Sequence, residues 1–437
     1  MRREFIAGIV LACGFPGSCA KYQPRALNPA QSETQFRNRT IGGVSLNPDT
    51  LTALALRYNS DLAVARAKAA ATEAAVITAR QRVNPSFSGE GGYNRTPDSL
   101  STYSVSPAFT IETAGKRGFR ILAAQKAAEA AGEAVHETEW QVRSSVRTAL
   151  VAYWAAAQRL KLLQSEKALR TEIAAILEKR VLRGETANPE FAAARAEQAL
   201  VDVSLRNAEG EANRSLAALA VILGLPAAAL EGQSIDCSSF ENPAAPDSLS
   251  LLSVQQAGLL HRSDVRRSLA EYEAADARLR LELANQYPNI SLNPAYSFQE
   301  GFPAYTLGSV IDSLPVFHRH QGPIAEAEAE RSQVAAQFRA VQAKAIGNTE
   351  LARRQYASAV SEWMSAKDSL ARIQRQRETA VRAAFQAGGS DRLELTQARL
   401  FSLMAAQASL DALQRAQTAF GALQDAVEAP LVAGAKH

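Results

Sequence analysis

Hydrophobic and polar positions change their period in a fixed order along the first half of the chain. From Leu51 to about Val83, apolar residues recur at spacings of three and four, which predicts a helix. Asn84 and Pro85 end this pattern, because the residue before a proline is pushed out of the helical region. Residues 87–93 and 103–111 then alternate between two faces, so the pattern predicts a hairpin of two strands over residues 85–111.

A much longer helical stretch follows this hairpin. From Gly118 to about Leu182 the pattern continues for about 65 residues, or roughly 98 Å at the rise of a helix. It ends at a polar turn containing glycine, and a further helix runs from about Pro189 to Leu223. The helices of residues 51–83 and 189–223 together match the long one in length. We therefore expect them to lie end to end and antiparallel beside it.

The whole order of elements occurs twice. Residues 59–93 align without a gap with residues 262–296, at an offset of 203. Further along the offset becomes 204, where Gly184 matches Gly388. The second copy therefore predicts a hairpin over 289–316, a long helix over 323–387 and a last helix over 392–427. Within that hairpin the second strand, from Tyr305 to about Val316, alternates less regularly than the others.

We therefore predict a mainly α-helical protein with a small β part of four strands per chain and a two-fold internal repeat. The pattern divides the chain into six parts. These are a signal segment at 1–20, an N-terminal segment at 21–50, the first repeat at 51–224, a linker at 225–250, the second repeat at 251–427 and a tail at 428–437.

The four strands raise the question of how their sheet is completed. Strands of about ten residues with one apolar and one polar face match those of a transmembrane β-barrel, although an ordinary surface hairpin has the same pattern. In lipid the backbone groups of an open sheet edge cannot be satisfied, so strands of other chains would have to close the sheet. Two chains would give eight strands around a filled interior, whereas three would give twelve around an open lumen. The pattern favours a trimer.

Composition and charge exclude other classes of function. The chain has 48 basic and 44 acidic residues, a net charge of +4, and no basic block with interleaved aromatic residues. Nucleic acid is therefore not expected as a partner. No glycine-rich phosphate loop stands between a strand and a helix, and the order of Ser, His, Cys and carboxylates suggests no nucleophilic catalysis. We expect neither an enzyme nor a cofactor.

The N-terminus resembles a secretory signal. A basic start and a short apolar run are followed by small residues, which indicates a signal peptide over 1–20. In a lipoprotein Cys19 would be the modified residue, with Cys13 as the alternative, while ordinary cleavage after Ala20 fits the same residues. With Cys19 as the anchor, Cys237 is the only free thiol of the mature chain. Beyond residue 20 no apolar run approaches the roughly 18 residues of a membrane-spanning helix.

Two pieces of sequence, "IETAGKRGFR" at 111–120 and "LPVFHRHQGPIAEA" at 314–327, carry a family resemblance together with the repeated order of elements. The chain resembles the TolC-like outer-membrane efflux proteins, and most closely their lipoprotein branch serving cation or drug pumps. The resemblance covers about Leu46 to Val427. It implies a homotrimer with a 12-stranded barrel in outer-membrane lipid and a periplasmic α-helical barrel. Such a trimer is the exit duct of a tripartite pump, with a periplasmic adaptor and an inner-membrane transporter of the RND type.

The same resemblance gives a role to the two glycine turns. In the family these turns are the periplasmic tips, which contact the adaptor through a Val-Gly-x-Thr motif. The chain keeps Gly and Thr in the first turn but has Ser in place of Thr in the second. Two helix-hairpin turns without a partner are the alternative. The residues expected to contact the adaptor are Arg183, Gly184, Thr186, Gly388, Gly389 and Ser390.

Carboxylates follow both turns. Glu394 stands six residues after Gly388, where the family carries a carboxylate that rings the closed periplasmic aperture, and Glu190 is its equivalent in the first repeat. In a trimer three such carboxylates would bind cations or, when bare, repel one another. The alternative is a carboxylate in the first turn of a helix, stabilised by the helix dipole.

Local spacing predicts how the helices after the turns begin. Asn188 is expected to cap the helix that has Pro189 at its first position. Asp391 and Glu394 have the spacing of a capping box.

His318 and His320 invite a metal interpretation. Two histidines at a spacing of two, without a nearby Cys or acidic partner, are a weak basis for a site, so a solvated junction between strand and helix is favoured.

The rival function is that of a periplasmic adaptor or a structural coiled-coil lipoprotein of a transport complex. An adaptor has one helical hairpin between β-rich domains, whereas this chain has two repeats and no long β-rich flank. The exported substrate, metal or drug, does not follow from the residues. Neither do the identity of the pump and adaptor or the open or closed resting state.

Overall fold

The structure is a computed structural model that describes residues 22–43, 45–92, 102–244, 262–299, 302–312 and 314–431. The chain divides into two compact units between Arg39 and Thr40. The first unit contains helix α1 (Pro29–Arg37), whose N-terminus is capped by the Asn28 side chain. All further elements belong to the second unit. The predicted signal segment, with Cys13 and Cys19, lies outside the described residues.

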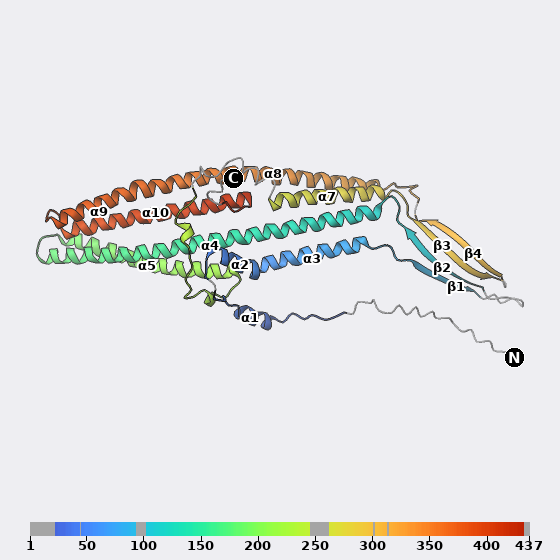
Figure 1. Cartoon of the computed structure of the whole chain (residues 1–437), viewed down its shortest axis with the longest axis horizontal. Helices are drawn as coiled ribbons and strands as arrows, with labels where there is room; N and C mark the ends of the chain where they lie inside the picture. The colour runs from blue at the N-terminus through green and yellow to red at the C-terminus, as the bar shows by residue number, and fades with distance from the viewer. Residues whose placement is uncertain are drawn as a thin grey trace. The chain divides into compact units, whose positions relative to one another are not determined.

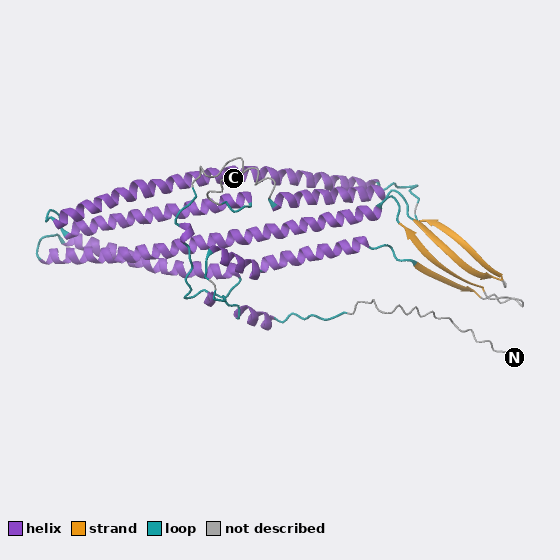
Figure 2. Cartoon of the chain, viewed as in Figure 1, coloured by secondary structure: helices purple, strands orange, loops and turns teal. Residues whose placement is uncertain are grey.

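Helices dominate the second unit, and its described strands form one antiparallel sheet (Figure 2). The predicted fold class is therefore confirmed. None of the described helices is long and apolar enough to cross a membrane. The helices are α2 (Pro48–Tyr58), α3 (Ser60–Arg80), α4 (Lys116–Leu182), α5 (Asn188–Leu223), α7 (Ser263–Ala284), α8 (Gln321–Met364), α9 (Ala371–Gln386) and α10 (Arg392–Val427), with the short helices η1 (Ala227–Ala229), η2 (Ser238–Phe240) and η4 (Ser365–Leu370).

The sheet has the order β1-β2-β3-β4, with β1 (Ser86–Gly92), β2 (Thr102–Ile111), β3 (Ile290–Gln299) and β4 (Phe302–Ile311). The sequence predicts the last strand from Tyr305 to about Val316, and this is wrong. The hairpin is tighter than the pattern suggests, because Phe302 already pairs with Gln299 and Pro303 with Phe298. Pro303 does not break the strand, since a proline is compatible with a strand at a sheet edge.

The first predicted helix, over residues 51–83, is in fact two helices. Asn59 lies between α2 and α3 with an extended backbone, and its side-chain oxygen accepts hydrogen bonds from the N–H groups of Asp61 and Leu62. This cap starts a new helix within an unbroken apolar pattern. The second helix ends at Arg80, three residues before the predicted end.

The second long helix, predicted over 323–387, is also interrupted. In the first repeat α4 runs without a break from Lys116 to Leu182. In the second repeat α8 and α9 are joined by η4, a six-residue π-helix. Nothing in the apolar spacing marks this interruption, since the helix continues on both sides of it.

The short helices pack along the long ones as the lengths predict. Both α3 and α5 lie along α4, while α7 and α10 lie along α8 and α10 continues along α9 (Figure 1). The long helix α4 also contacts α7 and α10, and these two contacts join the first repeat to the second. Among the described helices, α4 therefore packs against helices of its own repeat on one side and of the other repeat on the other side.

Equivalent contacts hold the stacked helix ends in both repeats. In the first repeat the Asn59 amide donates a hydrogen bond of 3.4 Å to the carbonyl of Ile222 at the end of α5. In the second, 203 residues after Asn59, the Arg262 guanidinium donates to the carbonyl of Ala426 at the end of α10. Each bond satisfies a backbone oxygen that a helix end leaves without a partner.

The residues that end α5 and α10 differ between the repeats. Gly224 ends α5 with a φ of +68°, and a Cβ added there would lie 2.6 Å from the carbonyl oxygen of Tyr58. Its equivalent is Glu428, which adopts a φ of +49°. The Glu428 carboxylate accepts hydrogen bonds from the N–H (2.7 Å) and hydroxyl (2.6 Å) of Ser263, so it caps α7 in place of the side chain of Arg262.

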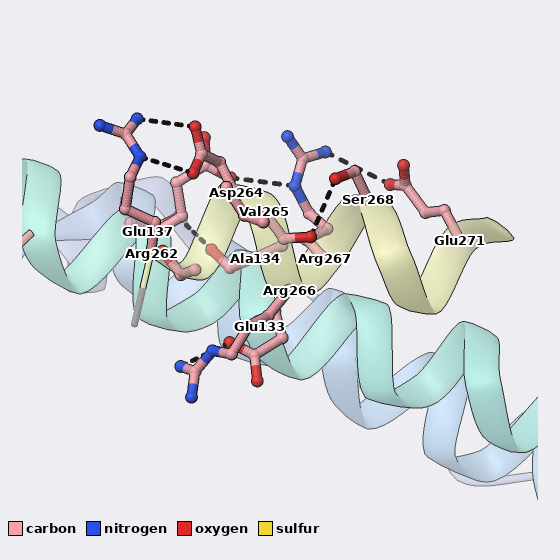
Figure 3. A network of polar contacts seen from close by, with 12 residues as sticks. Glu133, Ala134, Glu137, Arg262, Asp264, Val265, Arg266, Arg267, Ser268 and Glu271 are labelled. Atoms are coloured by element: carbon pink, nitrogen blue, oxygen red, sulfur yellow. Dashed lines mark hydrogen bonds and ion pairs between the residues drawn. The ribbon is translucent and has the colours of Figure 1, made fainter. Parts of the chain in front are cut away.

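Ion pairs line the contact between α4 and α7 below this junction (Figure 3). Arg266 lies 2.8 Å from Glu133, and Arg267 lies 3.0 Å from Glu137. Burial raises the pKa of the Glu137 carboxyl above its usual value, and the neighbouring Arg267 opposes this change. The charges bind the two repeats side by side where α7 begins.

The largest apolar core lies at the junctions of the stacked helices. It combines residues of α2, α4, α5, α8 and α10 with the segment that follows α5. In that segment the ring of Phe240 packs against Trp154 of α4 at 6.1 Å, and its carbonyl accepts a hydrogen bond from Gln417 of α10. Residues 225–244 of the predicted linker therefore cross both repeats. The rest of the linker, 245–250, the start of the second repeat, 251–261, and the end of the tail, 432–437, lie outside the described residues.

Basic residues of the "AGKRGFR" segment bind the ends of the helices that lead to the sheet. The buried Lys116 donates a hydrogen bond of 2.6 Å to the carbonyl of Tyr287, beyond the end of α7. Arg117 donates to the carbonyl of Arg80 at the end of α3, and Arg120 donates to the carbonyls on either side of it. This cluster fixes both repeats where helices pass into strands.

The close approach at Gly224 leads to a stability prediction. We expect Gly224→Ala to lower the stability of the protein by more than the roughly 1–2 kcal/mol of a left-handed backbone, because the Cβ also meets the Tyr58 carbonyl. Gly132→Ala is the control, since no atom lies within 4 Å of its added Cβ and a helical Gly-to-Ala change gains about 0.5–1 kcal/mol. Thermal unfolding followed by circular dichroism measures both. Equal melting temperatures of the two variants would contradict the account.

Candidate functional site

The two glycine turns have the same backbone structure. In the first, the N–H of Gly184 bonds to the carbonyl of Val181 (2.9 Å) and the N–H of Glu185 to that of Arg180 (2.8 Å). In the second, the N–H groups of Gly388 and Gly389 make the same two bonds, 204 residues later, to Phe385 and Ala384. Gly184 and Gly388 have φ values of +74° and +78°, which explains the glycine at both positions. One helix-ending motif occurs twice.

The helices after the turns begin differently. Asp391 caps α10, since its side chain accepts a hydrogen bond of 2.8 Å from the N–H of Glu394. The predicted capping box is only half formed, because the Glu394 carboxylate accepts from the Ser390 hydroxyl instead. The prediction for Asn188 is wrong. Asn188 is the first residue of α5, and Ala187 precedes it without a side-chain cap. The extended Ala187 and the following Pro189 suffice to start the helix, because proline fixes a helical φ.

Both turns lie at the same end of the second unit, far along the helices from the sheet (Figure 1). The side chains and backbone of the predicted contact residues are accessible there. Thr186 and Ser390 are half-buried, while Arg183, Gly184, Gly388 and Gly389 are exposed. The turns therefore present one surface, formed from both repeats.

Two ion pairs join the turns. Arg180, at the end of α4, lies 2.7 Å from Asp391, which starts α10. In the second pair the basic residue belongs to α10, since Arg392 lies 2.7 Å from Glu172 of α4. The hydrogen bond of Arg180 holds the pKa of Asp391 below its usual value, so Asp391 stays ionised. The ion pair of Arg180 with ionised Asp391 contributes its full stabilisation at pH values above the ordinary pKa of an Asp. Because the pKa of Asp391 is lowered, this stabilisation is lost only as the pH falls through that lowered pKa.

The two predicted aperture carboxylates are exposed. Glu394 lies in the first turn of α10, and Ser390 donates a hydrogen bond of 2.7 Å to its carboxylate. Glu190 lies in the first turn of α5. The structure does not bring Glu394 and Glu190 together by any contact among the described residues.

Apolar support near the turns is small. A cluster of Ile173, Ala174 and Leu177 on α4 packs with Ala194 of α5 and Leu400 of α10. It is far smaller than the core at the helix junctions. Near the turns, the pair of α4 and α5 is therefore held to the pair of α9 and α10 mainly by polar contacts.

The residues considered for metal binding are not assembled into a site. His320 makes a contact of 2.7 Å with Glu282 where β4 passes into α8. Within the described residues, no three side chains of His, Cys, Asp or Glu are grouped as metal ligands. Cys237 is half-buried, and burial raises the pKa of its thiol to about 11.

The ion pairs between the turns were not found from the sequence. Arg180 and Asp391 are 211 positions apart, and no local spacing relates them. The repeat places both turns at one end, which is the only sequence signal that points toward such a contact. The register of α4 against α10 decides which charges meet.

Comparison with known proteins supports this description of the fold. Residues 51–225 match the model of the family described as "Outer membrane efflux protein". The cobalt-zinc-cadmium resistance protein CzcC of Cupriavidus metallidurans is 24% identical over 378 residues, which cover 85% of this chain and 88% of that protein.

Solved structures have the same fold. The outer-membrane channel OprN matches with a TM-score of 0.71 and 19% identity, over 88% of this chain and 90% of its own. The outer membrane protein VceC of Vibrio cholerae matches with a TM-score of 0.70 and 18% identity, over 87% of this chain and 96% of its own. Residues 51–225 thus match the outer membrane efflux protein family, and the described chain has the TolC-like fold of these outer-membrane channels.

Proposed function

We propose that three copies of this chain form the exit duct of a tripartite efflux system, set in the outer membrane and extending into the periplasm. This proposal rests on one observation. Within the chain the two repeats pack against each other along one side, while the opposite side of each repeat remains uncovered. The chain is thus built to continue its own arrangement into a ring of copies.

The open sides are visible in the order of the elements. Within the sheet, β1 and β4 are the edge strands, and each has a partner on one side only. In the helical part α4 packs against α3, α5, α7 and α10, whereas its equivalents α8 and α9 pack mainly against α7 and α10. By the repeat, the missing neighbours of α8 and α9 are α3 and α5 of another copy.

The contact between α4 and α10 is the template for the contact between copies. Asp425 of α10 accepts hydrogen bonds from Trp140 (3.1 Å) and Ser144 (2.6 Å) of α4, and Gln407 donates to Glu166 (3.0 Å). These polar bonds form the seam between the two repeats. The repeat offset of 204 carries both α10 positions onto α5.

The equivalent positions on α5 are apolar and exposed. Asp425 corresponds to Val221 and Gln407 to Val203, with exposed fractions of 76% and 59%. On the other side, Glu166 corresponds to Leu370, which is 41% exposed. Large apolar side chains at these positions are explained if α5 packs against α8, η4 and α9 of the next copy. At these three positions the seam is polar inside the chain and would be apolar between chains.

Strand number supports three copies. Two chains would close a sheet of eight strands, whose interior is filled by side chains, and three would close one of twelve around a lumen. An exit duct requires the lumen. The exposed aromatic and aliphatic side chains of β2 and β4, such as Phe109 and Tyr305, would then face outer-membrane lipid.

The tip surface is proposed to bind the periplasmic adaptor of the system. Arg183, Gly184 and Thr186 of one turn and Gly388, Gly389 and Ser390 of the other would make the contact. Glu394 would line the periplasmic aperture, with Glu190 on its periphery. An inner-membrane pump of the RND type would deliver the substrate, and Cys19 would anchor the chain through a lipid.

Divalent metal cations are the proposed substrate class. This rests on the similarity to the cobalt-zinc-cadmium resistance protein, which extends over most of both chains. A duct needs no metal site of its own, because the inner-membrane pump selects the substrate.

Glu394 gives a test of the channel and its aperture. In planar bilayers we expect the protein to form cation-preferring channels, and Glu394→Gln to reduce that preference, because a ring of three carboxylates attracts cations. Glu190→Gln is the matched control and should leave the preference unchanged. Identical ion selectivity of the wild type and both variants would remove Glu394 from the aperture.

Deletion of the protein tests the substrate class. A strain without it should become more sensitive to cobalt, zinc and cadmium salts, and plasmid expression of the chain should restore growth. The growth panel should include organic drugs and dyes at graded concentrations. Sensitivity to the drugs alone would contradict the assignment to metal cations.

A further inference from the structure

The polar face of the sheet carries a single charged side chain in the described strands. Residues directly opposite each other in neighbouring strands share a face, and the register joins Glu90 of β1 to Ser104 of β2 and Ser104 to Ser297 of β3. All other residues of this face in β1–β4 are uncharged, and most of them are Ser, Thr, Ala or Gly. Glu90 is therefore the only charge that the described strands present on this face.

Small neighbours leave the Glu90 side chain free to extend from the sheet. Ser88 and Gly92 lie on either side of it along the same face of β1. Glu90 is exposed and makes no hydrogen bond or ion pair with any described residue. Glu112, by contrast, lies 2.5 Å from Arg120, which neutralises it where β2 passes into α4. The Glu90 carboxylate thus has no counter-charge among the described residues.

The repeat places Asn293 at the position equivalent to Glu90. The offset of 203 that carries Pro85 onto Pro288 also carries Glu90 onto Asn293. Asn293 shares the polar face of Ser297, which lies four residues further along β3. The carbonyl oxygen of its side chain is buried without a hydrogen-bond partner among the described residues. Both repeats therefore have an oxygen-bearing side chain at this position, and in the first repeat it is an anion.

Closure of the sheet by two further copies turns its polar face toward the lumen, because the apolar face meets lipid. The lumen wall then holds three Glu90 carboxylates that alternate with three Asn293 amides. No basic side chain lies on the described strands of this wall. Just beyond β4, Asp312 accepts a hydrogen bond of 3.0 Å from Ser291 of the same face, and it adds a negative charge toward the helices. A wall with carboxylates and no basic side chain attracts cations and repels anions.

We propose that the ring of Glu90 carboxylates makes the barrel selective for cations, at a place separate from the periplasmic aperture. The ring rests on the function proposed above, since it exists only when three copies close the sheet. Glu90 lies in the sheet and Glu394 at the far end of the helices (Figure 1). A cation leaving through the duct then meets a negative ring at the aperture and a second one at the exit, while anions are repelled at both.

Ion selectivity in planar bilayers tests the ring, with Glu394→Gln as the background so that the aperture carboxylates do not contribute. The Debye length is about 30 Å at 0.01 M salt and about 3 Å at 1 M, so the ring acts over the lumen only at low salt. At 0.01 M KCl we expect Glu90→Gln to lower the permeability ratio of K⁺ to Cl⁻ about twofold or more, and Glu90→Lys to lower it further. Glu90→Asp keeps the charge and should keep the ratio. At 1 M KCl all these proteins should have similar ratios.

Thiol modification gives a second measurement that needs no conducting channel. Asn293→Cys, in a full-length Cys237→Ser protein in detergent at low salt, is treated with a cationic and with an anionic methanethiosulfonate reagent. The ratio of the cationic to the anionic rate should fall about twofold or more when Glu90→Gln is added, because the carboxylate draws cations toward residue 293. Glu90→Asp is again the control and should keep the rate ratio.

Unchanged ion selectivity of conducting Glu90→Gln channels would overturn the proposal. Equal rate ratios at residue 293 with and without the carboxylate would do the same, and so would a residue 293 that reacts with neither reagent. A wild-type protein that forms no channels would instead count against the duct. In that case the thiol rates still decide whether Glu90 acts on the polar face where Asn293 lies.

Discussion

The seam between α4 and α10 is the contact on which the rest of the structure depends. It joins two repeats that each lack one neighbour, and its polar bonds to Asp425 and Gln407 fix their register. Because α8 and α9 repeat α4, and α5 repeats α10, the chain offers the equivalent helix faces, with other side chains, at its outer sides. The exposed Val203 and Val221 lie on the outer face of α5, where the proposed contact with another copy would form.

Much of the fold follows from pattern alone. Alternation of side chains gives the strands, and helical spacing with glycine and proline stops gives the ends of α4, α5 and α10. The offset between repeats gives the order of the whole. These features are local or periodic, and they depend on backbone preference and on which face is apolar. The predicted strand β2 and the helix α10 have the bounds observed in the structure.

What the sequence did not predict depends on register and on distant contacts. Asn59 divides a helix because its side chain caps the start of α3. At other positions an asparagine lies within a helix without ending it, so the residue type alone does not predict the break. The π-helix η4 lies within an unbroken apolar pattern, because the helix continues on both sides of it. Arg180 meets Asp391 only because two helices distant in sequence lie at one particular register. Site residues at the tips are therefore predictable as turns, but their partners are not.

The two repeats differ in structure at two places along their helices. At the stacked helix ends Gly224 is replaced by Glu428, whose strained backbone is accompanied by its capping bonds to Ser263. Toward the tip one repeat has a continuous helix and the other a π turn. The duplicated chain therefore keeps the order of its elements and differs at particular helix ends and in one turn of a long helix.

Cross-linking between copies tests the central claim most directly, that the seam inside the chain recurs between chains. Arg159 of α4 binds Asp411 of α10, and the repeat carries this pair onto Glu362 of one copy and Asn207 of the next. A Cys237→Ser protein with Glu362→Cys and Asn207→Cys, treated with a short bifunctional thiol reagent, should give covalent dimers and trimers on a denaturing gel. With Cys at Glu209 in place of Asn207, about 200° around the helix, these bands should be weak or absent. Equal cross-linking by both pairs, or none by either, would contradict the account.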